Sequence, residues 1–334
     1  MPIRESASLT LESSLSVRND MDQSLLDTMR VVALPMKTNF RGINLREVAL
    51  FKGEFGWGEF SPFLEYSYEE CAPWLASAIE AATKPRPKFH RNSVKVNGTI
   101  PALNDPKVIE GIVNSFSGVN TFKVKVGDNL SEDIARLAKV RALHPHAALR
   151  IDVNGNWSVG AAITNLRAIY ENLGALEYVE QPCATVEELR ELKEKLQVNI
   201  PIAGDEVLRK ARDPFEIDLS DAVDILMLKV QPLGGIVRAH QLAKHHNLPV
   251  VVSSAIESAV GVNYGLILAA SFPELNFDCG LGTGSLLATN VAELPIIDGQ
   301  IHIREFEPEF SGHEVVPERY EWWKNRVMKT AELL

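Results

Sequence analysis

The chain has 334 residues, a length that suits two ordinary domains or one large α/β barrel with an additional part. Hydrophobic residues make up 46% of it and charged residues 23%, which excludes a mainly disordered, collagen-like or coiled-coil protein. The formal net charge of −10 repels phosphate groups, so nucleic acid and anionic lipid surfaces are not expected as partners.

The cysteines and the apolar stretches indicate the cellular compartment in which the protein is expected. Cys71, Cys183 and Cys279 are far apart and form no CxxC pair, which excludes a disulfide framework and a structural zinc site. No stretch reaches the roughly 18 apolar residues of a membrane span, and the first residues lack the apolar run of a signal peptide. We therefore expect a cytoplasmic protein that does not insert into membranes.

The N-terminal part predicts a small antiparallel unit. Residues 1–26 are rich in Ser, Asp and Glu and are expected to form a loosely ordered extension without chemistry. Two β segments follow, at 29–34 and 45–51, with a loop at 35–44 between them and a turn-like stretch at 53–60.

A helix is predicted at residues 68–82, where Trp74, Ala78 and Ala82 recur every fourth residue. Pro85 and Pro87 end this segment, which places a domain boundary near residues 84–98.

Beyond residue 92, short β-rich runs alternate with amphipathic helical stretches, the pattern of βα units. The expected helices include 131–143, with Ser131 as N-cap, and 185–196, which opens with Thr185 and Glu188 at capping-box spacing. Eight predicted strands favour a closed barrel over an open doubly wound sheet. They are residues 93–98, 121–127, 149–155, 177–182, 200–206, 225–231, 249–255 and 276–282.

One polar residue interrupts each of six successive strands near its C-terminal end. These residues are Lys125, Asp152, Glu180, Asp205, Lys229 and Ser253. Their spacing of 24 to 28 residues matches the βα unit of a barrel, whose active sites lie at the C-terminal ends of the strands. Three carboxylates would meet there between two ammonium groups. Oxygen ligands without His or Cys indicate a hard divalent cation, with Mg²⁺ the natural candidate.

Lys123 and Lys125 are two residues apart in one strand and therefore share a face. Repulsion from the Lys123 ammonium would help Lys125 to give up its proton and act as a general base on a carbon acid. A pair of solvated lysines at the strand end is the alternative.

Two weaker motifs lie near the last strands. Gly280, Gly282 and Gly284 are interpreted as a backbone anion nest at the barrel rim. Residues 253–258, with the sequence SSAIES, offer hydroxyl groups to a substrate, but no Gly-x-Ser-x-Gly elbow surrounds them. A serine hydrolase is therefore not expected.

The motif set, in order, resembles the enolase superfamily in its muconate-lactonizing subgroup. It consists of KVK at 123–125, DVN at 152–154, EQP at 180–182, GDE at 204–206 and the single Lys229. The resemblance extends over nearly the whole chain from about Met29, because FRGI at 40–43 and GWGEFSPF at 56–63 are similar to the capping domain of that superfamily. Around residues 40–66, SSAIES and GLGTG, the chain is most similar to the o-succinylbenzoate synthases of the actinobacterial type.

This resemblance implies a modified TIM-type (β/α)7β barrel with an α+β capping domain formed by both terminal segments. The expected boundaries are 27–98 for the N-terminal part of the cap, 99–286 for the barrel and 287–334 for the return to the cap. Residues 1–26 are an extension that the family does not require.

The resemblance also implies roles for single residues. Asp152, Glu180 and Asp205 would bind Mg²⁺, Lys125 would be the base, and Lys229 would stabilise the enediolate. The expected supporting or substrate-binding residues are Lys123, Asn154, Glu206, Arg41, Ser253, Ser254, Gly282 and Thr283.

The implied activity is a Mg²⁺-dependent dehydration of a small-molecule carboxylate in menaquinone biosynthesis. It would convert 2-succinyl-6-hydroxy-2,4-cyclohexadiene-1-carboxylate to 2-succinylbenzoate. A racemase of N-acylamino acids or a dipeptide epimerase of the same superfamily stays open, and so does a non-catalytic binding barrel. The sequence carries no prediction of the oligomeric state.

Overall fold

The computed structural model describes residues 23–40, 42–127 and 129–334. Residues 1–22 of the predicted extension lie outside the described residues. The rest of it, residues 23–26, belongs to helix α2 (Gln23–Asp27), in which Leu25 is buried. A three-stranded antiparallel sheet follows, in the order β1 (Arg30–Phe40), β2 (Ile43–Gly53) and β3 (Gly56–Phe60). Helix α3 (Tyr68–Thr83) packs against it and begins at a capping box of Ser67 and Glu70.

The loop predicted at 35–44 is wrong, because β1 and β2 continue through it as a long hairpin. Pro35 pairs with Leu45 and is tolerated because β1 is an edge strand. The register shifts between Pro35 and Phe40, where the proline and Gly42 indicated a loop. The stretch at 53–60 is a turn only in its first half and then forms β3.

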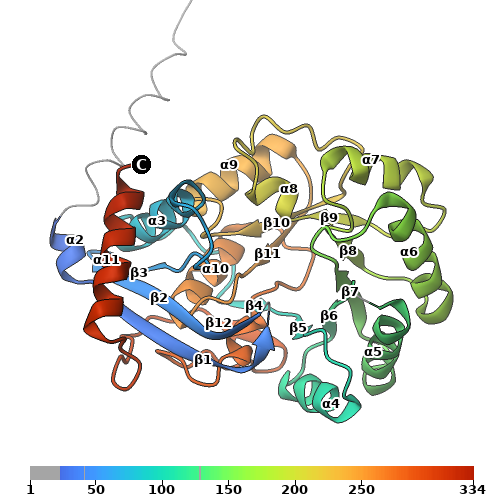
Figure 1. Ribbon diagram of the computed structural model, residues 1–334, viewed down its shortest axis with the longest axis horizontal. Coiled ribbons are helices and arrows are strands. Elements are labelled where there is room, and N and C mark those ends of the chain that lie inside the picture. Colours follow the sequence, from blue (N-terminus) through green and yellow to red (C-terminus); the bar gives the residue numbers. More distant parts are fainter. Residues whose placement is uncertain (1–22, 41, 128) are drawn as a thin grey trace, which may run out of the picture.

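The second unit is a curled parallel sheet of seven strands (Figure 1). Its order follows the chain: β5 (Gly98–Ile100), β6 (Thr121–Lys125), β7 (Ala148–Asp152), β8 (Tyr178–Glu180), β9 (Ile202–Gly204), β10 (Ile225–Lys229) and β11 (Val250–Ser253). The helices between and after them are α4 (Pro106–Ser115), α5 (Leu130–Leu143), α6 (Val159–Leu173), α7 (Val186–Lys195), α8 (Glu206–Arg209), α9 (Ile236–His246) and α10 (Ala259–Ser271).

Residues 279 and 280 occupy the eighth position and close the ring. Gly280 forms a parallel bridge with Ser253 of β11, and Cys279 forms one with Val96, just before β5. The expected strand at 276–282 is thus reduced to two bridged residues. The first expected strand is split: β4 (Ser93–Lys95) pairs with β12 (Gln300–His302), and only β5 joins the barrel. The predicted barrel with an α+β cap is confirmed.

Two predicted helix starts have different outcomes. The capping box of Thr185 and Glu188 is confirmed at the start of α7. Ser131 is not the N-cap of α5, because Asn129 accepts the amide hydrogen bonds and the helix already begins at Leu130. Asn is an equally good capping residue, and it stands two positions earlier.

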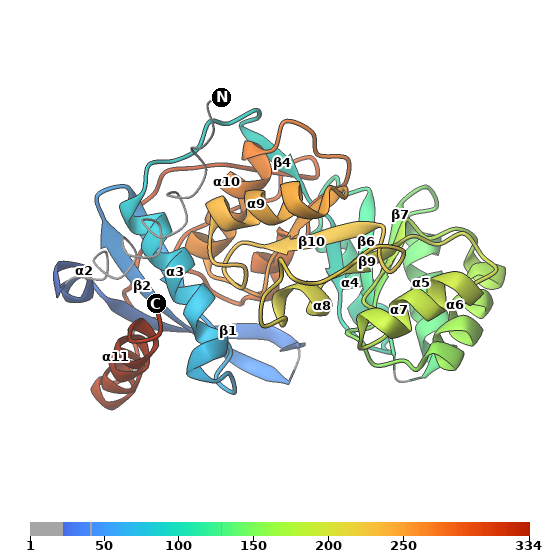
Figure 2. The same ribbon diagram turned by 90° about the horizontal axis from the view of Figure 1, so that it is seen from above.

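The C-terminal segment leaves the barrel and runs along the cap. After a short 3-10 helix, η1 (Gly282–Leu286), and β12, helix α11 (Pro317–Ala331) lies beside α3 at the cap end of the molecule (Figure 2). Trp323 is fully buried there, with its ring edge-on to Phe60 and its Nε1 donating to Glu47 at 2.6 Å. We propose the boundaries 26/27, 98/99 and 286/287; helix α2 crosses the first, and β5 begins one residue before the second.

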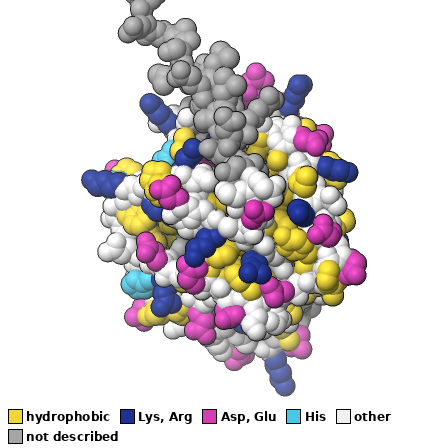
Figure 3. All heavy atoms as spheres, turned by 90° about the vertical axis from the view of Figure 1, so that its left-hand side faces the viewer, with side chains coloured by type: hydrophobic (Ala, Val, Ile, Leu, Met, Phe, Trp, Pro, Cys, Tyr) yellow, Lys and Arg dark blue, Asp and Glu magenta, His cyan; other side chains and the backbone are white. Residues whose placement is uncertain are grey.

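On the face that Figure 3 shows, acidic, basic and apolar side chains are interspersed. Cys71, Cys183 and Cys279 are all buried and free. Within the described ranges, no helix is both long and apolar enough to span a membrane.

Candidate active site

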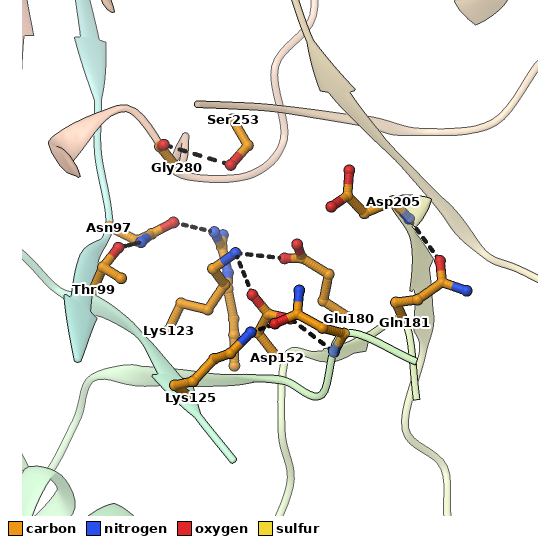
Figure 4. A network of polar contacts seen from close by, with 12 residues as sticks. Asn97, Thr99, Lys123, Lys125, Asp152, Glu180, Gln181, Asp205, Ser253 and Gly280 are labelled. Atoms are coloured by element: carbon orange, nitrogen blue, oxygen red, sulfur yellow. Dashed lines mark hydrogen bonds and ion pairs between the residues drawn. The ribbon is translucent and has the colours of Figure 1, made fainter. Parts of the chain in front are cut away.

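The register of the parallel sheet brings the predicted site residues together. Lys125 of β6 is paired with Asp152 of β7, and Asp152 is paired with Glu180 of β8. Lys229 and Ser253 are paired at the ends of β10 and β11, and Asp205 directly follows β9. Because all these strands are parallel, their last side chains converge at one end of the barrel. Figure 4 shows Lys125, Asp152, Glu180, Asp205 and Ser253 of this group.

Lys123 lies deeper in this group than Lys125. Its Nζ is 2.8 Å from Glu180 Oε2 and 3.2 Å from Asp152 Oδ2, whereas Lys125 Nζ is 3.5 Å from Asp152 Oδ1. The charge of Lys123 is therefore balanced by two carboxylates, which offset the repulsion that Lys123 was expected to exert on Lys125. Lys125 is more accessible, with 27% of its side chain exposed against 10% for Lys123.

Asp205 receives two cations. Lys229 Nζ is 2.6 Å from Asp205 Oδ2, and Arg209 Nε is 3.1 Å from Oδ1. Arg209 also donates to Glu206 at 2.6 Å and to the hydroxyl of Tyr66, from the cap, at 3.2 Å.

Arg209 was not among the predicted site residues, although it stands four positions after Asp205, the spacing of neighbours on a helix. Gln181 was also missed as a supporting residue. Its Oε1 accepts the backbone N–H groups of Asp205 and Val207 at 3.0 and 3.2 Å and thereby fixes the start of α8.

Burial and the neighbouring cations shift the pKa values of the carboxyl groups in opposite directions. Burial alone would raise the pKa of Asp152, but the ammonium groups of Lys123 and Lys125 outweigh it and hold that pKa at about 2. For Asp205 the cations of Arg209 and Lys229 also outweigh burial and lower the pKa. For Glu180 burial wins over Lys123 and raises the pKa to about 7. The pKa of Lys123 is raised well above its ordinary value, since Asp152 and Glu180 outweigh its burial.

Lys125, Asp152 and Lys229 line a cavity of about 460 Å³ between the barrel and the cap. Glu180 and Asp205 are fully buried behind them and do not line it. The barrel contributes the charged end groups, and the cap contributes Asn39, Phe63 and Trp74. Asn154 also lines the cavity and donates to Glu206 at 3.2 Å, so these two predicted supporting residues lie together. A space of this size, polar on one side and partly aromatic on the other, suits a small organic acid.

The rim residues have mixed outcomes. Ser253, Ser254 and Thr283 line the cavity, and the hydroxyls of Ser254 and Thr283 are 2.7 Å apart. Gly282 does not line it, because this residue packs against the backbone of Asn97, where an added Cβ would come within 2.9 Å.

The anion nest is wrong. Gly280 bridges Ser253, and Gly282 and Gly284 lie in the 3-10 helix η1. None of the three glycines has the positive φ that a nest requires. Arg41, the remaining predicted substrate contact, lies outside the described residues.

The three carboxylates fit a hard divalent ion by their chemistry. In the described part of the chain no three His, Cys, Asp or Glu side chains form a ready metal cage, because Lys123 and Lys229 reach between the acids. The fully buried Oε1 of Glu180, however, accepts no hydrogen bond from any described residue. A buried oxygen of this kind needs a cation or a donor, so Asp152, Glu180 and Asp205 are suited to holding Mg²⁺.

Comparison with known proteins agrees with this geometry. Residues 31–82 match the family described as enolase N-terminal domain-like, and residues 112–308 match the family described as enolase C-terminal domain-like. The o-succinylbenzoate synthase of Mycolicibacterium smegmatis is 46% identical over 310 residues, which are 91% of this chain and 95% of the relative. That of Mycobacterium leprae is 46% identical over 318 residues, 93% of each chain.

Solved structures share the fold at lower identity. The L-Ala-D/L-Glu epimerase of Bacillus subtilis superposes with a TM-score of 0.70 at 20% identity, over 86% of this chain and 98% of that one. A dipeptide epimerase of Enterococcus faecalis, complexed with Mg and a dipeptide, gives 0.68 at 21% identity, over 86% and 98%. The chain belongs to the enolase superfamily and, within it, to the o-succinylbenzoate synthase family.

Proposed function

We propose that Lys125, Lys229 and the three carboxylates carry out the reaction of this family. The reaction is the loss of water from 2-succinyl-6-hydroxy-2,4-cyclohexadiene-1-carboxylate to give 2-succinylbenzoate, a hydro-lyase step of menaquinone biosynthesis. The observation that carries the residue assignment is the placement of two lysines on opposite walls of one cavity. Lys125 ends β6 and Lys229 ends β10, and three strands that deliver the carboxylates lie between them.

The proposed sequence of bond changes needs one base. Lys125 Nζ, in its neutral form, takes the proton α to the ring carboxylate, and the C–H electron pair moves into that carboxylate to form an enediolate. The ring C–O bond then breaks, the ammonium of Lys125 returns the proton to the leaving hydroxyl, and water and the aromatic product form. One lysine can do both because the proton and the hydroxyl leave from the same face.

The other residues stabilise the negative charge of the enediolate and hold the metal and its ligands in place. The ammonium of Lys229, on the opposite wall, is placed to stabilise the negative charge of the enediolate. Mg²⁺ held by Asp152, Glu180 and Asp205 would supply positive charge next to the substrate carboxylate. Arg209 and Lys229 hold the Asp205 carboxylate in place.

This proposal makes a small carboxylate the natural partner of the chain. It also keeps the cytoplasmic location expected from the sequence, since the proposed substrate is a small soluble metabolite acid.

Turnover of the cyclohexadiene substrate with and without Mg²⁺ tests the proposal. We expect activity with Mg²⁺ and its loss after chelation. Asp205→Asn should lower kcat by at least about 10²-fold, because it removes one metal ligand and the partner of two cations. An unchanged far-UV circular dichroism spectrum would show that the fold persists. Full activity after exhaustive chelation would contradict the metal assignment.

A further inference from the structure

Glu59, at the end of the cap sheet, is a buried carboxylate that the mechanism does not use. Only 3% of its surface is exposed, and it accepts hydrogen bonds from five donor groups that belong to four residues. The backbone N–H groups of Ser258 and Gly261 donate at 3.1 and 2.8 Å, and the Ser258 hydroxyl donates at 2.5 Å. The Ser61 hydroxyl donates at 2.7 Å and Gln231 Nε2 at 3.4 Å. Glu59 thus caps the N-terminus of barrel helix α10 from the other domain.

The segment just before α10 is part of the cavity wall. Ser254, Ala255 and Ile256 line the cavity that holds the candidate catalytic groups. Ile256 has φ of +62°, a conformation that a β-branched residue rarely adopts and that its surroundings must enforce.

Contacts with the cap enforce this conformation. Arg46, itself only 2% exposed, donates from Nε to the Ile256 carbonyl at 3.0 Å and from Nη2 to the Ser61 carbonyl. On the C-terminal side of Ile256, Glu59 fixes Ser258. Two buried charged side chains of the cap, Arg46 and Glu59, therefore hold the backbone at and just after Ile256.

We propose that Glu59 is a positioning residue for substrate binding: it holds the segment 254–258 in the shape that forms one wall of the cavity. The proposal rests on the proposed function only in treating this cavity as the substrate site. Ala255 and Ile256 present apolar surface and no acid or base, so they contact a part of the substrate that does not react. Such contacts contribute equally to substrate and transition-state binding, and their loss raises KM while kcat is retained.

The chain offers a matched control in Glu80, on α3 of the cap. Glu80 caps barrel helix α9 in the same way, accepting from the backbone N–H groups of Ile236 and Val237 at 2.5 and 3.3 Å. It also accepts from the Tyr264 hydroxyl at 2.6 Å. Glu80 and the residues it caps do not line the cavity. Its loss weakens the attachment of the cap to the barrel without touching the segment 254–258.

The test compares Glu59→Gln with Glu80→Gln in steady-state kinetics with saturating Mg²⁺. An amide presents an N–H group where the carboxylate accepted two backbone N–H groups, so one of those contacts becomes repulsive. We expect Glu59→Gln to raise KM about tenfold with kcat changed less than about threefold. Glu80→Gln should leave KM and kcat within about twofold of the wild-type values, even if it lowers the thermal stability as much as Glu59→Gln does.

A second measurement needs no turnover. In hydrogen exchange, Glu59→Gln should accelerate exchange in a peptide covering residues 254–261, whereas Glu80→Gln should accelerate it only around residues 235–240. If Glu59→Gln does not fold, Ser258→Ala removes one contact and should show the same two effects more weakly. Equal KM changes in the two glutamate variants, or unchanged exchange at 254–261, would overturn the role of Glu59. Absence of dehydration by the wild type would overturn the proposed function instead, and the exchange experiment would still decide on Glu59.

Discussion

At the scale of single residues, the position of Lys123 shows how the site tolerates buried acids. Its ammonium is within 3.2 Å of two carboxylates, one of which, Glu180, is fully buried. Without a cation at this point, Asp152 and Glu180 would repel each other in a region with little water. Lys123 therefore acts as an internal counter-ion and not as a free base.

Replacing Lys123 by Met should destabilise the protein strongly. Breaking a buried ion pair from one side typically costs about 3–5 kcal/mol because it leaves an uncompensated charge. Urea unfolding without added metal should show a loss of this order, and saturating Mg²⁺ should recover a large part of it by supplying positive charge to the same acids. An equal loss with and without Mg²⁺ would contradict the metal assignment of Asp152 and Glu180.

The sequence predicts the main polar residues of the site because they recur once per βα unit, and the strand register then places them side by side. It does not predict Arg209, because helix α8 has only four residues and carries no periodic pattern. Nor does it predict Glu59, whose main partner Ser258 is 199 positions away. Contacts over such distances have no local signal.

At the scale of elements, the connection between β11 and α10 contains a buried acid, Glu257. Burial, with a smaller contribution from the charge of Glu59, raises the pKa of Glu257 from 4.5 to about 7. The folded protein therefore favours the protonated form. This acid contributes stability that is fully present below pH 4.5 and is lost as the pH rises to about 7.

Glu257→Gln should remove this dependence, because the amide resembles the neutral acid. A shift from 4.5 to about 7 corresponds to about 3 kcal/mol. The unfolding free energy of the variant relative to the wild type should therefore rise by an amount of this order between pH 4.5 and pH 8. Urea unfolding at both pH values measures it, with the exposed Glu321→Gln as control. A constant difference between Glu257→Gln and the wild type would show that this acid does not titrate in that range.

Element boundaries were predicted less well than element types. The sequence predicts two short strands in place of the hairpin of β1 and β2, because Pro35 and Gly42 are turn residues, yet Pro35 lies on a sheet edge that tolerates it. The eighth strand shrinks to Cys279 and Gly280, because η1 begins at Gly282. Tertiary context, which a single sequence does not display, decides both cases.

At the scale of the whole molecule, α11 attaches the end of the chain to the cap. Trp323 is buried between Phe60 and Glu47, whereas its neighbour Trp322 is 37% exposed. Arg326 reinforces the attachment by donating to the carbonyls of Phe63 and Tyr66 at 2.9 Å.

Trp323→Ala should cost about 3–5 kcal/mol of unfolding free energy, because it opens a large cavity and leaves Glu47 with one donor fewer. Trp322→Ala, on the same helix, should cost less, since Trp322 is already 37% exposed and loses cation–π contacts with Arg319 and Arg326 and one ring contact with Trp323. Thermal or urea unfolding of the two variants compares them directly. Equal losses would mean that α11 does not hold the cap through the Trp323 side.

In the proposed reaction one lysine, Lys125, both removes and returns the proton, while Lys229 stabilises charge from the opposite wall. NMR in deuterated water, following α-proton exchange and dehydration together in the wild type, Lys125→Ala and Lys229→Ala, tests it most directly. We expect Lys125→Ala to lose both reactions, and Lys229→Ala to lose about 10²–10³-fold in dehydration rate. The opposite result would be α-proton exchange in one substrate enantiomer that persists in Lys229→Ala, together with no dehydration of the cyclohexadiene acid by the wild type. That result would contradict the one-base mechanism and favour a two-base racemase.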